Sequence, residues 1–176
     1  MHVQTHIMSG WCIADLLELT PRERLFAMIA ASAADVDGLG ILVSIDYYVR
    51  YHHVLAHNLP FGVLLAILLT ISSQHRWKAL WLYLGLFHLH LIMDYFGSGP
   101  AWGFLYLWPF SDAMTQNVHA WELASWQNVV VTAGLIAWTI VIAIKSGRTP
   151  FELIAASIDR KIVGTLRARA SAAPDR

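Results

Sequence analysis

The feature that most constrains this chain is a continuous apolar run at residues 129–144, VVVTAGLIAWTIVIAI, followed by Lys145 and Arg148. A helix needs about 20 mainly apolar residues to cross a bilayer core of about 30 Å. Two further apolar segments, 54–73 and 79–96, approach that length and are joined by the basic turn QHRWK. These segments predict an integral membrane protein.

The overall composition agrees with a membrane protein and excludes other classes. The chain of 176 residues is 57% hydrophobic and 14% charged, and its eight tryptophans are typical of proteins with membrane interfaces. A formal net charge of zero, without a basic and aromatic cluster, argues against a nucleic-acid partner. The single cysteine, Cys12, excludes an intrachain disulfide and a cysteine-based zinc site.

The first fifty residues predict two more helices, at 6–19 and 25–34, joined by TPRER. In this linker Thr20 is suited to an N-cap, Pro21 to the first helical position and Glu23 to the position three after the cap. The N-terminal segment has no basic region and contains Asp15 and Glu18, so we expect no signal peptide. The expected fold is therefore all-α: an integral membrane helical bundle of about five membrane-associated helices plus a C-terminal amphipathic helix.

Lysine and arginine predict the orientation. They occur in both hairpin turns and after residue 144, whereas residues 97–127 contain none. The positive-inside rule places both turns and the C-terminus in the cytoplasm, and the N-terminus and the 97–127 loop outside. We expect a multi-pass protein of the cell inner membrane.

The C-terminal part predicts an amphipathic helix, because five apolar residues recur at helical spacing among basic ones: Phe151, Ile154, Ile158, Ile162 and Leu166. Such a helix either lies on the inner membrane interface or packs on the protein's own cytoplasmic side. We therefore divide the chain into a membrane-embedded metal-binding catalytic domain, 1–148, and a cytoplasmic amphipathic basic tail, 149–176.

Ionisable residues interrupt the apolar helices, and ionisable groups in such helices cost free energy unless they have a partner or a function. Counted from the turn near Arg76, His57 and Asp94 both lie about 25 Å up their helices, and His90 is one turn below Asp94. The same count in the first hairpin brings His6 and Asp35 to about 20 Å. Asp37 and His52 follow at helix ends near this level. Histidine or aspartate residues from four segments are therefore expected at one depth in the membrane, near the outer face.

Imidazoles and carboxylates without thiolates form a ligand set for a divalent ion, most favourably zinc, with manganese or iron as alternatives. The predicted ligands for one or two ions are His6, Asp35, Asp37, His52, His57, His90 and Asp94. His53 could replace His52, since His53 and His57 have i, i+4 spacing. His88 points away from His90, and we expect His2, His75 and His119 to take no part.

The motifs resemble a known family, the predicted membrane-bound metal-dependent hydrolases of the LexA-regulated inner-membrane type. The resemblance covers about residues 1–112 and rests, in order, on Thr5-His6, ADVDG with Asp35 and Asp37, HHVLAHN with His52 and His57, His90-x-x-x-Asp94, and WPF at Trp108 to Phe110. The sequence departs from the family pattern at two places. His53-Val54 stands where the family has Arg-Gly, and Ala56 stands where it has Thr. More loosely, the order of ligands is similar to zinc-dependent phospholipase C and related nucleases, a likeness that leaves the substrate open but favours a phosphoester.

We therefore expect a membrane-bound metal-dependent hydrolase that acts on a phosphoester or lipid-like substrate through a metal-activated water. Asp35 or Asp37 would be the general base, and His53 would protonate the leaving group. The expected partners are membrane lipid and a small-molecule or lipid-like ester. The alternatives are a di-iron membrane oxygenase, although its histidine boxes contain fewer aspartates, and a metal or proton transporter, although the inner halves of the helices are apolar.

Overall fold

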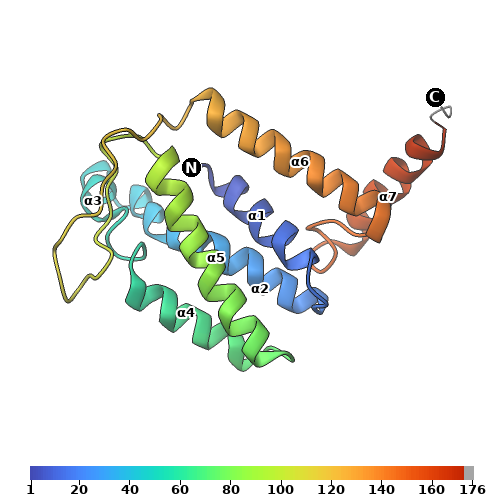
Figure 1. The fold of residues 1–176 in the computed structure, drawn as a ribbon, viewed down its shortest axis with the longest axis horizontal. Coiled ribbons are helices and arrows are strands. Elements are labelled where there is room, and N and C mark those ends of the chain that lie inside the picture. Colours follow the sequence, from blue (N-terminus) through green and yellow to red (C-terminus); the bar gives the residue numbers. More distant parts are fainter. Residues whose placement is uncertain (173–176) are drawn as a thin grey trace.

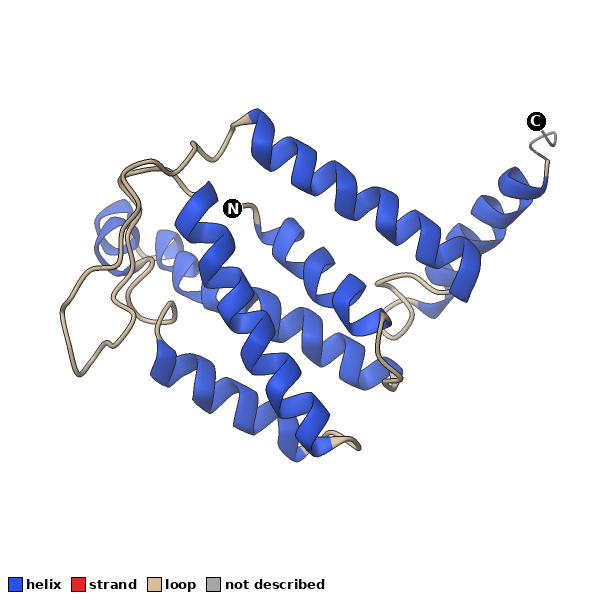
Figure 2. Ribbon diagram, in the orientation of Figure 1, coloured by secondary structure: helices blue, strands red, loops and turns tan. Residues whose placement is uncertain are grey.

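The structure is a computed structural model that describes residues 1–172, and these residues form a helical bundle (Figures 1 and 2). Residues 173–176, the end of the expected tail, lie outside the described residues. The elements are α1 (Val3–Asp15), α2 (Pro21–Ser32), the 3-10 helix η1 (Ala33–Leu42), α3 (Ile45–Tyr51), α4 (Leu59–Ile71), α5 (Arg76–Gly97), α6 (Trp126–Ser146) and α7 (Ala156–Ser171). An isolated bridge between Phe104 and Thr115 is the only β-type pairing within residues 1–172. The all-α prediction is confirmed.

Three helical segments are long and apolar enough to cross a membrane: Pro21–Leu42, which combines α2 and η1, Arg76–Gly97 and Trp126–Ser146. Helices α1 and α4 have 13 residues each. At 1.5 Å per residue such a helix extends only about 20 Å, less than the hydrocarbon thickness of about 30 Å. The structure therefore supports a membrane protein with three candidate spans, and the expected number of about five is not confirmed.

The helix expected over 54–73 begins later, at Leu59. Residues 52–58 form turns instead, and the Asn58 side chain caps α4 by accepting a hydrogen bond of 2.9 Å from the Phe61 amide. Pro60 occupies the first turn of the helix, where its missing N–H costs little. The shorter helix leaves His53 and His57 on an irregular segment that can turn toward α5.

The capping signals in TPRER are confirmed. Thr20 and Glu23 form a capping box at the start of α2, and Pro21 is its first residue. The preceding helix, expected at 6–19, runs from Val3 to Asp15. After Ser32 the chain tightens into η1, which carries both aspartates of ADVDG.

Small residues bring α1 and α2 into close contact. Gly10 faces α2 so closely that a Cβ added at this position would lie 2.6 Å from the Ala27 carbonyl oxygen and 2.7 Å from the Ala31 Cβ. Helix α2 also packs against α5, α5 packs against α4, and α6 packs against α1. Between α4 and α5, Gly62 lies against the Phe87 ring. These contacts hold α1, η1 and α5 in a fixed register, which positions the site.

Ion pairs and a hydrogen bond connect the two basic turns and the start of the tail at one end of the bundle. The Arg24 guanidinium donates to both Glu152 carboxylate oxygens at 2.6 Å, and Arg148 pairs with Asp15. The His75 amide donates to Glu23 at 2.8 Å. The two turns and the start of the tail therefore share an end, as the distribution of basic residues predicts.

The tail helix begins at Ala156, later than its apolar pattern suggests. Asp159 accepts hydrogen bonds from both the amide and the hydroxyl of Thr149, at 2.6 and 2.7 Å. These two hydrogen bonds hold residues 149–155 in turns, so Phe151 and Ile154 precede the helix. Helix α7 then packs against the end of α6 (Figure 1).

Candidate metal centre

Histidines and aspartates from four segments meet at the end of the bundle opposite the paired turns. His6 comes from α1, Asp35 and Asp37 from η1, His90 and Asp94 from α5, and the remaining members are His52, His53 and His57 from the α3–α4 connection. Of these side chains only Asp35 and His52 keep appreciable exposure. All seven residues predicted as ligands therefore lie in or beside one buried polar cluster.

The tightest part of the cluster is a group of four potential ligands: Asp35, His57, His90 and Asp94. One ligand atom from each lies within 4.8 Å of all the others. The Asp94 Oδ2 atom is 3.0 Å from His90 Nε2 and 3.4 Å from His57 Nε2. Asp35 Oδ1 lies 3.8 Å from His90 Nε2. The i, i+4 spacing of His90 and Asp94 on α5 places their side chains on one face, as predicted.

Hydrogen bonds on the far side of each ring determine which nitrogen faces the group. His90 Nδ1 lies 2.8 Å from the Ala31 carbonyl oxygen, which can only accept, so Nδ1 carries the proton. His57 Nδ1 lies 3.0 Å from Asp37 Oδ2 and donates to it. In neutral rings both Nε2 atoms then present lone pairs, and these atoms are 3.2 Å apart. Two nitrogen and two carboxylate donors converge on one space.

Asp37 holds two histidines at once. Its Oδ1 atom accepts from His52 Nδ1 at 2.7 Å, and its Oδ2 atom accepts from His57 Nδ1 at 3.0 Å and from the Ala56 amide at 3.2 Å. Both oxygens are therefore engaged on the side of the histidines away from the four-ligand group. A carboxylate that fixes the tautomer and orientation of a ligand histidine is a common support of metal sites.

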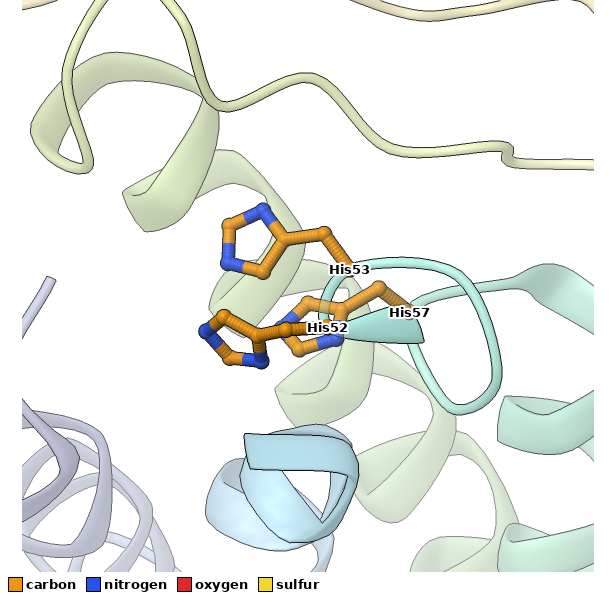
Figure 3. Close-up of side chains that lie close together, drawn as sticks. All are labelled: His52, His53 and His57. Atoms are coloured by element: carbon orange, nitrogen blue, oxygen red, sulfur yellow. The ribbon is translucent and has the colours of Figure 1, made fainter. Parts of the chain in front are cut away.

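His52, His53 and His57 form a second group of potential ligands (Figure 3). The His53 ring stacks on the His57 ring with centroids 4.1 Å apart, and its Nε2 lies 3.9 Å from Asp94 Oδ2. His53 has φ of 67°, in the left-handed region that costs free energy for a residue other than glycine. Tertiary contacts hold this conformation and aim the ring at the cluster.

The two stacked histidines differ in protonation. Burial, together with the neighbouring His57 charge, lowers the pKa of His53 to about 2, so its ring is neutral. Burial also disfavours the charged form of His57, but hydrogen bonds to Asp37 and Asp94 outweigh it and raise the pKa of His57 to about 9. In the metal-free protein a proton on His57 thus compensates part of the carboxylate charge.

Unpaired buried atoms concentrate in the cluster. Within residues 1–172, three of its atoms are buried without a hydrogen-bond partner: His6 Nδ1, Asp35 Oδ2 and His53 Nδ1. His6 Nε2 lies 3.2 Å from Asp94 Oδ1, and its ring stacks on His90. The α-amino group of Met1 also contacts Asp94. Unsatisfied buried donors and acceptors cost free energy, so this donor set fits a bound divalent cation.

Three of the remaining histidines, His75, His88 and His119, have surroundings outside the cluster. His88 bonds to the Leu84 carbonyl and to the Tyr106 hydroxyl, at 2.8 and 2.9 Å. His75 pairs with Glu23 in the turn at the opposite end, and His119 is exposed in the long loop.

A cavity of about 150 Å³ opens beside the cluster and is lined by Asp35, His52, His53 and Asp94. It also contains residues that the sequence analysis did not identify: Tyr48, Ser98, Trp102 and Glu122. The Trp102 ring lies 5.6 Å from both His52 and His53. Trp102 belongs to the aromatic segment GSGPAWGFLYLWPFSD that follows α5, and no local pattern distinguishes it from the other tryptophan of that segment.

The fold and the site together define an all-helical membrane protein with a buried histidine and aspartate cluster at one end of its bundle. The chain belongs to the YdjM inner membrane protein family, whose model matches residues 1–167. That description supports the inner-membrane location and names no reaction. No curated protein and no solved structure matches the chain.

Proposed function

We propose that this protein is a membrane-bound metal-dependent hydrolase whose ion is held by Asp35, His57, His90 and Asp94. The observation that carries the proposal is the convergence of two imidazole lone pairs and two carboxylates on one buried space. Such a group is costly unless a cation occupies the space. Zinc suits a mixed nitrogen and oxygen set of four, and manganese or iron remain alternatives.

His52 and His53 are the nitrogen donors next to this group, and they would serve a second ion. His57 belongs to both groups, but its Nδ1 is engaged by Asp37 and its Nε2 faces His90. A second ion would therefore need a carboxylate shared from Asp35 or Asp94. His6 supports the cluster through Asp94 and the His90 ring.

A divalent ion at this site would supply Lewis acidity and lower the pKa of a bound water toward about 7. Asp35 is the proposed general base, because its Oδ2 has no hydrogen-bond partner and its side chain lines the cavity. Asp37 would orient His52 and His57 instead of taking the proton. His53 is better suited to holding an ion than to protonating a leaving group, since it is buried and stacked on His57.

The proposed substrate is a phosphoester, consistent with the resemblance of the motifs to zinc-dependent phosphoesterases. The cavity is small, about 150 Å³, and its lining includes the apolar side chains of Trp102 and Leu123 beside the polar groups. Such surroundings would favour a polar reacting group attached to a lipid-like remainder.

A transport function receives less support. Between the cluster and the opposite end, the bundle is filled by buried apolar side chains such as Leu86, Ala27 and Ala30. A path for protons or ions would need polar groups to continue through this layer.

The proposal is tested with full-length protein purified in detergent. The metal content is measured by mass spectrometry, and turnover is measured with an activated phosphoester. We expect at least one equivalent of metal, loss of turnover with a chelator and recovery with zinc or manganese. Asp35→Asn should abolish turnover, whereas Asp112→Asn, in the exposed loop, should not. Protein that binds no metal, or that consumes oxygen with bound iron, would overturn the proposal.

A further inference from the structure

A large apolar cavity lies apart from the metal centre, between the bundle and the tail helix. It has a volume of about 440 Å³, within the range of about 300–1,000 Å³ typical of ligand pockets. Its walls come from α1, α6 and α7, including Ile7, Met8, Ile140, Ala143, Ile162 and Leu166. The lining is almost entirely carbon, so a polar ligand has nothing to bind there.

A second hollow on α7 adjoins a cation and shares two residues with the cavity. Ile162 and Leu166 also line a second hollow of about 290 Å³, whose remaining residues are Lys161 and Thr165. Ile162 and Leu166 therefore separate the large apolar cavity from a hollow that is lined by an ammonium group and a hydroxyl. This arrangement fits an amphiphile with a long apolar chain and an anionic head.

The exposed face of α7 is positively charged. Arg160, Lys161, Arg167 and Arg169 are exposed, whereas the acidic residue of the same helix, Asp159, is buried and accepts hydrogen bonds from Thr149. Arg167 is directed to the carbonyl oxygens of Ile144 and Lys145 at the end of α6. Within residues 1–172, Arg160, Lys161 and Arg169 form no ion pair.

We propose that this groove, lined by α1, α6 and α7, binds an anionic phospholipid, with an acyl chain in the apolar cavity and the phosphate at Lys161. The protein lies in a membrane, so phospholipid is the apolar ligand present at the highest concentration. Basic residues beside an apolar helical face attract anionic lipids. The site would fasten α7 to the bundle, because one chain would contact all three helices.

The test uses full-length protein in detergent, from which lipid has been removed. Phosphatidylglycerol and phosphatidylcholine with identical acyl chains are titrated separately, and bound lipid is counted by native mass spectrometry. We expect tighter binding of phosphatidylglycerol. Lys161→Gln should weaken it about fivefold, the effect of one basic residue near an anionic surface, and should leave phosphatidylcholine unaffected. Arg169→Gln is the matched control on the same helix and should have a smaller effect.

A second pair of variants tests the apolar cavity. Met8→Trp fills it and should weaken binding of both lipids, whereas Val130→Trp, on an exposed part of α6 outside the cavity, should not. Retained metal content and thermal unfolding show that each variant is folded. Equal affinity for the two lipids, equal effects of Lys161→Gln and Arg169→Gln, or binding unchanged by Met8→Trp would overturn the proposal. A dimer that forms without lipid and is lost in Met8→Trp would instead make the groove an interface between copies.

Discussion

The Nε2 atoms of His57 and His90 face each other at 3.2 Å, although the two residues come from different segments of the chain. The opposite nitrogen of each ring is engaged by an acceptor, Asp37 Oδ2 for His57 and the Ala31 carbonyl for His90. Two nitrogen lone pairs cannot hydrogen-bond to each other without an intervening proton or cation. In the metal-free protein the proton that His57 holds fills this role, and a bound cation would replace it.

Replacing His90 by alanine should remove most of the bound metal, because His90 Nε2 is one of four converging donors. His88→Ala is the matched control, since His88 lies two positions earlier on α5 and bonds to Leu84 and Tyr106 instead. Metal content of the purified variants, measured by mass spectrometry, checks the prediction. Equal metal content in both variants would exclude His90 as a ligand.

Asp37→Asn should weaken metal binding about 10–100-fold, the usual cost of losing a carboxylate that supports ligand histidines. The amide has one acceptor oxygen in place of two, so it cannot accept from both His52 and His57. A competition titration with a metal chelator measures the affinity. Turnover should recover at saturating metal if Asp37 only orients the rings, whereas persistent loss would assign it a direct role in the reaction.

The stability of the metal-free protein should fall as the pH rises toward about 9. The pKa of His57 is raised to about 9 from its ordinary value of 6.5, so the folded state holds the proton more tightly than the unfolded state. The stabilisation that the His57 proton gives the folded state is fully present below pH 6.5, decreases above that pH and is lost above about 9. We expect a loss on the order of 1–3 kcal/mol, measured as the free energy of unfolding in chelator.

His57→Gln provides the control for this pH dependence, because glutamine carries no titrating proton. The slope of stability between pH 6.5 and 9 should largely disappear in this variant. A wild-type protein whose stability is flat or rises over that interval would contradict the prediction.

Gly10→Ala should destabilise the bundle by about 1–3 kcal/mol, the usual cost of overpacking. The added Cβ would lie 2.6 Å from the Ala27 carbonyl oxygen, and a helix backbone cannot move aside as a flexible side chain can. Gly134→Ala on α6 is the matched control, because nothing lies within 4 Å of its Cβ position. Alanine there should be neutral or stabilising by up to about 1 kcal/mol. Thermal unfolding followed by circular dichroism compares the two variants, and equal melting temperatures would refute the close contact of α1 and α2.

Much of the fold could be predicted from local patterns. The apolar segments, the capping box at Thr20 and the i, i+4 pair His90 and Asp94 depend on residues close in sequence. Helical rise is nearly constant, so distances counted from a turn bring His6, Asp35 and Asp94 to one level without knowledge of the packing.

The ends of helices were harder to predict where tertiary contacts oppose the longer helix that the apolar pattern favours. Residues 54–58 are apolar enough to extend a helix, yet they form turns because Asn58 caps α4 and His57 is bonded to Asp37. Phe151 and Ile154 have helical spacing with α7 but precede it, because Thr149 is bonded to Asp159. In both cases one or two side-chain contacts outweigh a weak local preference.

The sequence by itself determined that the chain is helical, membrane-associated and equipped with ionisable residues at one level of its apolar helices. Only the tertiary structure decided which nitrogen of each histidine faces the cluster, that Asp37 supports two rings, and that Trp102 joins the cavity. The physical reason is that helix formation and burial follow from short-range periodicity. Ring orientation instead depends on acceptors such as the Ala31 carbonyl, which lie far away in the sequence and come close only when the helices pack.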